Sequence, residues 1–179
     1  MKNIVFMFLA SLFLFGTSCE DKTAMAELEA FKLKQQVQQQ NKEIVRKYWD
    51  GKWNERRPEV LDELQSPDVV YHGTSMQMNG RDEYNEVYAS YLSAMQNSQV
   101  QINQLIAEDD FVMSRVRLKA VHKGELDGLP ATGNEVVVSM FTIFRLVDGK
   151  IVEEWEVMDE LGMMAQLGFE LQLKEALEK

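Results

Sequence analysis

Two long strand patterns joined by a tight turn constrain the fold more than any other part of this sequence. The turn is Asp148-Gly149. An Asp-Gly pair between two apolar runs indicates a β-hairpin, because glycine adopts a positive φ without steric cost. The strand before the turn, Val136–Val147, is apolar on both faces, which is typical of a strand covered on both sides. We expect helices on one face and a second subunit on the other.

Helical patterns precede most of the strand patterns along the chain. Apolar residues recur at helical spacing in residues 41–53, 58–64 and 81–95. Strand patterns occupy residues 69–72, 100–107, 111–123, 136–147 and 150–157, and a short helix follows the last of them. Helices followed by an antiparallel sheet predict the α+β class.

The beginning of the chain has the features of a signal peptide. Residues 4–15 are almost wholly apolar but too few to span a bilayer, and small residues then lead to Cys19, the only cysteine in the chain. This pattern resembles a bacterial lipoprotein cleavage site. We predict a signal peptide over 1–18, lipidation of Cys19, and anchoring at the cell envelope, on an outer membrane facing the periplasm or the cell surface. An ordinary secretory signal with an incidental cysteine remains an alternative.

The mature chain is predicted to have three parts. Residues 19–40 form a lipid-anchored polar helical spacer, residues 41–168 the folded domain, and residues 169–179 a helical tail. The stretch 23–40 has few apolar positions and neither glycine nor proline, so it also fits the exposed first half of the domain's first helix.

The net charge of −10 limits the partners of the chain. Nucleic acid is not expected, because phosphate binding needs a basic surface. An acidic surface also disfavours docking on anionic lipid, so membrane attachment would depend on acyl chains at Cys19.

Four segments, in this order, resemble the SnoaL-like or "ester cyclase" proteins of the nuclear-transport-factor-2-like superfamily. They are residues 41–53 (NKEIVRKYWDGKW), 61–72 (LDELQSPDVVYH), 124–133 (GELDGLPATG) and 144–168 (FRLVDGKIVEEWEVMDELGMMAQLG). The resemblance implies a cone: a strongly curved antiparallel sheet packed on N-terminal helices, with a pocket at the wide end. It also implies homodimers formed through the outer face of the sheet.

The resemblance implies a site as well. Polyketide cyclases of this family use an acid on the last long strand as general acid/base for an aldol-type ring closure. Alignment through residues 147–151 places Glu156 at that position, where the cyclases have Asp. Their supporting His and their pocket Asn align with Thr142 and Tyr71. Many relatives instead have His at the positions of His72 and His122 and an acid at that of Asp159.

The candidate catalytic residues are therefore His72, His122, Glu156 and Asp159. The two histidines are the only ones in the chain, and a neutral His is a suitable general base near pH 7. A carboxylate in an apolar pocket can serve as the acid. Strict alternation places Glu156 and Asp159 on opposite faces, so they compete for the pocket. A structural role for each histidine remains an alternative.

The expected pocket lining is Tyr71, Met140, Thr142, Phe144 and Trp155. We expect neither a metal nor a cofactor, because the sequence has no tight spacing of metal ligands and no glycine-rich phosphate loop. Two functions fit these residues. One is an acid/base enzyme (cyclase, isomerase or hydrolase) acting on a small apolar carbonyl compound. The other is a non-catalytic lipoprotein that binds a small hydrophobic ligand or serves as a dimeric scaffold.

Overall fold

The computed structural model describes residues 17–170 of the 179. Most of the predicted signal peptide, most of the predicted C-terminal tail and the side chain of Cys19 lie outside the described part. The chain separates into two compact units, the first ending at Val37 and the second beginning at Gln38. In the first unit, residues 22–37 are helical and exposed. Among the helices of residues 17–170, none has the length and apolar character needed to cross a bilayer.

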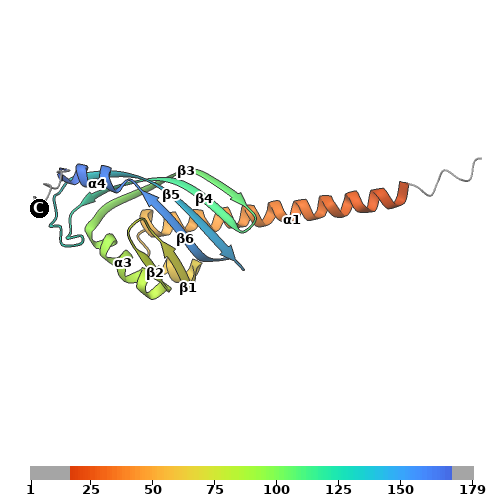
Figure 1. Cartoon of the computed structure of the whole chain (residues 1–179), viewed down its shortest axis with the longest axis horizontal. Coiled ribbons are helices and arrows are strands. Elements are labelled where there is room, and N and C mark those ends of the chain that lie inside the picture. The colour runs from red at the N-terminus through yellow and green to blue at the C-terminus, as the bar shows by residue number, and fades with distance from the viewer. Residues whose placement is uncertain (1–16, 171–179) are drawn as a thin grey trace, which may run out of the picture. The chain divides into compact units, whose positions relative to one another are not determined.

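Helices and strands follow one another much as the sequence predicts (Figure 1). In chain order they are α1 (Thr17–Trp49), the π-helical turn η1 (Asp50–Asn54), α2 (Glu59–Leu64), β1 (Gln65–His72), β2 (Gln77–Asn79), α3 (Arg81–Ala94), β3 (Met95–Glu108), β4 (Phe111–His122), β5 (Glu135–Val147), β6 (Lys150–Met158) and α4 (Glu160–Leu167). The short strand β2 was not predicted, and β1 and β3 begin earlier than their sequence patterns indicated. The α+β class is confirmed.

The strands of residues 17–170 form a six-stranded sheet in the order β2-β1-β6-β5-β4-β3. The expectation of a wholly antiparallel sheet is wrong at one place, since β1 and β6 run parallel, with Tyr71 opposite Glu154 and His72 opposite Trp155. Strands joined by a tight hairpin must be antiparallel, but β1 and β6 are far apart in the chain and have no such constraint. This pairing determines which side of the sheet each residue at the end of β1 faces.

A β-bulge interrupts the regular alternation in β6. Arg145 pairs with Glu153, but the next residue of β5, Leu146, pairs with Ile151. The extra residue between Ile151 and Glu153 changes the face of the strand. As a result Ile151 and Glu154 are both fully buried on the inner side of the sheet.

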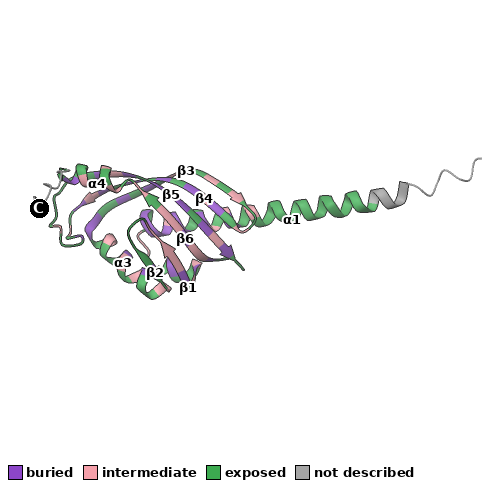
Figure 2. Cartoon of the chain, in the orientation of Figure 1, coloured by how far each residue is buried: buried purple, intermediate pink, exposed green. Residues whose placement is uncertain are grey.

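The inner and outer faces of the long strands differ sharply in burial. Figure 2 shows buried and exposed residues alternating along β4 and β5. Phe144 on the inner face of β5 meets the rings of Tyr48 and Trp49 from the end of α1 edge to face. On the outer face, Phe141 remains 52% exposed, so the second apolar face predicted for β5 is uncovered in the single chain.

The π-helical turn at the end of α1 directs Lys52 and Trp53 inward. Its residue Gly51 lies so close to α2 that an added Cβ would stand 2.6 Å from Val60 Cγ2, so only glycine fits there. Lys52 and Trp53 are both buried. A single π turn shifts the helical phase of the residues that follow, and such turns often occur at functional sites.

Candidate functional site

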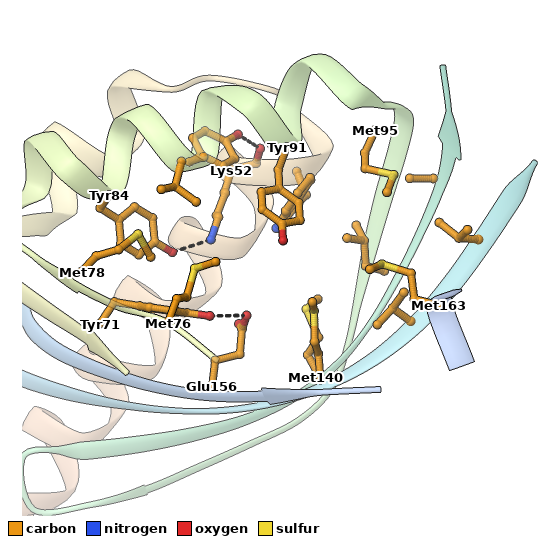
Figure 3. Close-up of a pocket in the computed structure, with 18 residues that line it drawn as sticks. Lys52, Tyr71, Met76, Met78, Tyr84, Tyr91, Met95, Met140, Glu156 and Met163 are labelled. Atoms are coloured by element: carbon orange, nitrogen blue, oxygen red, sulfur yellow. Dashed lines mark hydrogen bonds between the residues drawn. The ribbon is translucent and has the colours of Figure 1, made fainter. Parts of the chain in front are cut away.

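A cavity of about 90 Å³ lies between α3 and the inner face of the sheet (Figure 3). Most of its wall is apolar, and methionines supply much of it: Met76, Met78, Met95, Met140, Met158 and Met163. Thioether side chains are flexible and adapt to the shape of a ligand. The polar groups on the wall come from Lys52, Glu156 and several tyrosines. An apolar cavity with a few convergent polar groups is the usual form of a small-molecule site.

Glu156 of β6 places its carboxylate on this wall, held by two hydroxyl groups. Tyr71 Oη of β1 donates to Glu156 Oε1 at 3.1 Å, and Thr142 Oγ1 of β5 donates to Glu156 Oε2 at 3.0 Å. These are the three positions that the resemblance aligned with the polar pocket residues of the cyclases. The sheet register brings them into direct contact, because Thr142 is the cross-strand partner of Glu156.

On the other side of the cavity, Lys52 begins a buried hydrogen-bond network. Its Nζ donates to Tyr48 Oη at 3.0 Å and to Tyr84 Oη at 2.5 Å. The two phenol oxygens are 2.5 Å apart, and Tyr48 Oη also donates to Glu154 Oε2 at 3.0 Å. Thus two tyrosines connect the amine to a carboxyl group that lies fully buried behind the cavity wall.

Burial favours the neutral forms of the ionisable groups in this network. It raises the pKa of Glu154 to about 7, and the charge of Glu156 adds to this, whereas Lys52 opposes it. Burial also lowers the pKa of Lys52, against the effect of both glutamates. The pKa of Tyr84 is raised well above its ordinary value, first by burial and then by the two glutamates, so its phenol stays protonated.

Five aromatic rings surround Lys52 Nζ. The distances from Nζ to the ring centroids run from 4.9 Å for Tyr84 to 5.7 Å for Trp49 and Trp53, with Tyr48 and Tyr88 between them. Ring faces at this range attract a cation. Lys52 was not among the functional residues predicted from the sequence. The signal for it was a lysine placed among the aromatic residues of a helical stripe, four positions after Tyr48.

The structure does not bring the two histidines together with an acid in the cavity. His72 lies on the outer face of the sheet, where its ring stacks on Trp155 at 5.3 Å and its Nε2 is 3.0 Å from Glu153 Oε1. His122 is fully buried on the inner side, but it does not line the cavity. Its Nδ1 accepts the backbone N–H of Thr132 at 3.3 Å. His72 faces outward because it lies opposite the outward-facing Trp155 in the parallel pair of strands β1 and β6.

The other predicted residues divide between the cavity, the core and the outer surface. Tyr71 and Met140 line the cavity, and Phe144 packs behind it in the core. Trp155 faces outward with His72. Asp159 is exposed and caps α4, since its Oδ1 accepts the N–H of Gly162 at 2.9 Å. Of the two competing acids, Glu156 is the one on the cavity wall.

The part of the chain that the structure describes contains no group of three or more His, Cys, Asp or Glu side chains placed to hold a metal ion.

Comparison with known proteins relates most of the second unit to one family. The family model of SnoaL-like polyketide cyclases matches residues 43–167. The aklanonic acid methyl ester cyclase DauD of Streptomyces sp. (strain C5) is 26% identical over 127 residues, which are 70% of this chain and 77% of that protein.

Solved structures have the same fold. A candidate SnoaL-like polyketide cyclase from Jannaschia sp. CCS1 superposes with a TM-score of 0.69 at 24% identity, over 73% of this chain and 93% of that one. AclR, a candidate hydroxylase from Streptomyces galilaeus, superposes with a TM-score of 0.68 at 25% identity, over 77% of this chain and 91% of that one.

Proposed function

Because this chain belongs to the SnoaL-like polyketide cyclase family, we propose that it is an acid/base enzyme acting on a small apolar carbonyl compound. The observation that carries the proposal is the carboxylate of Glu156 on the wall of an otherwise largely apolar cavity, held by Tyr71 and Thr142. A carboxylate held in this way is oriented before substrate arrives, so it can take a proton with little reorganisation.

In the proposed reaction, Glu156 removes a proton from the carbon next to the substrate carbonyl. The electron pair of that C–H bond moves to form an enolate, and negative charge develops on the carbonyl oxygen. The enolate then attacks a second carbonyl carbon, closing a ring, or takes its proton back at another position.

The size of the cavity supports a small substrate, and the name of a relative supports a ring closure. The cavity measures about 90 Å³, which is room for a compact molecule and less than most drug-sized sites offer. The relative DauD is by name a cyclase of aklanonic acid methyl ester. The reaction proposed here is likewise a ring closure, at a carbonyl group of a compound small enough for this cavity.

Membrane attachment and dimer formation are part of the proposed function. We propose that acyl chains on Cys19 attach it to a membrane of the cell envelope, and that two copies associate through the outer face of the sheet. The dimer is supported by the exposed apolar side chains of that face, among them Phe141, Ile143 and Val157. Covering such a patch removes apolar surface from water.

Proton–deuterium exchange at the carbon next to a ketone tests the acid/base step. Cyclohexanone in D₂O, followed by proton NMR, should lose its α-proton signal faster with the protein than without it. Glu156→Gln should slow the catalysed rate by about 100-fold or more. Glu153→Gln is the matched control, because this carboxylate lies on the same strand but on the outer face. If the protein bound the ketone but did not catalyse exchange, the enzyme proposal would be rejected, and the chain would be a ligand-binding protein.

A further inference from the structure

We propose that Lys52 is a nucleophile of this cavity and forms an imine with the carbonyl carbon of a ketone bound there. The inference rests on the proposed function in one respect, the binding of a carbonyl compound in this cavity. It adds a covalent step, and it limits the substrates to aldehydes, ketones and diketones, as opposed to esters.

The position of Lys52 is the first argument. Its side chain runs inward from η1 and its Nζ lines the cavity, although the residue as a whole is only 7% exposed. Figure 3 shows Nζ directed towards the cavity from one side, with the carboxylate of Glu156 on the other. A carbonyl compound held between these two groups has an amine at one end and an acid/base at the other.

The hydrogen bonds of Lys52 fit a neutral amine. Nζ donates to two acceptors, the hydroxyl oxygens of Tyr48 and Tyr84. A neutral amine has two N–H groups and one lone pair, so these two bonds use its hydrogens and leave the lone pair for a carbonyl carbon. Burial lowers the pKa of Lys52, and a desolvated lysine in an apolar pocket is a known form of activated nucleophile.

The network also contains a group that can hold the proton which the amine gives up. Glu154 is fully buried and connects to Lys52 through Tyr48. No ion pair joins Lys52 directly to either glutamate among the described residues; the contacts run through the tyrosines. With the pKa of Glu154 raised to about 7, a neutral carboxyl beside a neutral amine avoids two buried charges.

The aromatic rings around Lys52 favour the cationic imine that the reaction would form. Attack of the Nζ lone pair on the carbonyl carbon forms a C–N bond, and the carbonyl oxygen takes a proton to give a carbinolamine. Loss of that oxygen as water, with one proton added to it, leaves a C=N bond. The protonated imine is a cation, and five ring faces within 5.7 Å of Nζ stabilise a cation at that place. The balance is one neutral amine, one ketone and one proton giving one protonated imine and one water, and the carboxyl group of Glu154, connected through Tyr48, supplies the proton.

The imine also makes the proposed proton transfer easier. A cationic C=N bond withdraws electrons from the neighbouring carbon more strongly than a carbonyl does. Glu156 then removes the α-proton to give a neutral enamine, and no enolate charge has to be carried by the cavity.

Reductive trapping tests the inference on the full-length chain. The protein is incubated with cyclohexanone and sodium cyanoborohydride at neutral pH and digested, and the masses of the peptides are measured by mass spectrometry. We expect one cyclohexyl group on Lys52 and little on exposed lysines. Lys47→Arg, which replaces an exposed lysine near the end of α1, should leave the labelling of Lys52 unchanged, and Lys52→Arg should remove it. Labelling spread over surface lysines, or no labelling of Lys52, overturns the proposal. This result comes from the wild-type protein, so it does not depend on whether a variant folds.

The deuterium exchange assay separates this proposal from the proposed function. Exchange that Glu156→Gln abolishes but Lys52→Arg retains, together with no trapped adduct, supports acid/base catalysis without the imine. Trapping of Lys52 without any catalysed exchange supports the nucleophile and rejects the enzymatic proton transfer. Trapping of Lys52 together with catalysed exchange supports both steps, imine formation by Lys52 and proton transfer by Glu156.

Discussion

Tyr71 donates a hydrogen bond of 3.1 Å to Glu156, although the two residues are 85 positions apart in the chain. The contact exists because β1 runs parallel to β6 and directs Tyr71 to the inner side of the sheet. We expect Tyr71→Phe to lower the free energy of unfolding by about 1.5 kcal/mol, the usual contribution of a hydrogen bond to a charged group. It should also slow α-proton exchange, since the carboxylate loses one of its two orienting partners. Urea unfolding and the NMR assay measure the two effects.

Tyr91→Phe is the control for that variant. It removes another phenol hydroxyl from the same cavity, one that has no hydrogen bond to Glu156 among the described residues. Equal losses in both variants would mean that the contact of Tyr71 with Glu156 has no particular importance.

Glu154 should make stability depend on pH. Its pKa in the folded protein is raised from 4.5 to about 7, chiefly by burial. Between these values the folded state keeps a proton that the unfolded chain releases, so the contribution is full below pH 4.5 and is lost as pH rises through about 7. Glu154→Gln keeps the shape without the titration. The difference in free energy of unfolding between wild type and variant should therefore shift in favour of the variant from pH 5 to pH 8. A difference that is constant with pH would show that Glu154 does not titrate in this range.

Asp159 should matter for stability and not for chemistry. Its carboxylate caps the N-terminus of α4 by accepting from Gly162 N–H. Asp159→Ala should cost about 1 kcal/mol of stability, as is usual for loss of a helix cap, and leave the exchange rate per folded molecule unchanged. Asp159→Asn retains a capping acceptor and should restore most of the stability. If Asp159→Asn reduced the exchange rate as strongly as Glu156→Gln, Asp159 would belong to the reacting groups.

The outer face of the sheet should mediate dimer formation. Phe141 and its cross-strand partner Val157 are 52% and 62% exposed there. We expect the wild-type chain to sediment as a dimer and Phe141→Glu as a monomer, because a buried unpaired charge is costly. Leu161→Glu is the control, since this residue is as exposed but lies on α4. A wild-type monomer at all concentrations would contradict the prediction.

Attachment to the membrane should depend on Cys19. In cells fed a labelled fatty acid, the wild-type chain should carry the label and sediment with the membranes. Cys19→Ser should lose the label and appear in the soluble fraction, because the acyl chains are the proposed anchor. A wild-type chain that stays soluble and unlabelled would favour an ordinary secretory signal.

Local patterns in the sequence were sufficient for much of this molecule. Side-chain alternation and the Asp148-Gly149 turn predict β5, β6 and the hairpin between them, and aromatic residues at helical spacing predict the inner face of α1. The family resemblance placed Glu156, Thr142 and Tyr71 in one site, and the structure brings these three into contact. The strands, the hairpin and the helical stripe are readable because they depend on neighbours in the chain, through a period of two or of 3.6 residues.

Contacts between distant segments decided the rest. His72 faces outward because of its register against β6, and Glu154 faces inward because of a bulge. Lys52 reaches the cavity because a π-helical turn, packed against Val60, changes the phase of the helix. No local period contains this information. Register, bulges and helical phase are set by which distant surfaces pack together, so the buried network of Lys52, Tyr48, Tyr84 and Glu154 is visible only once the chain is folded.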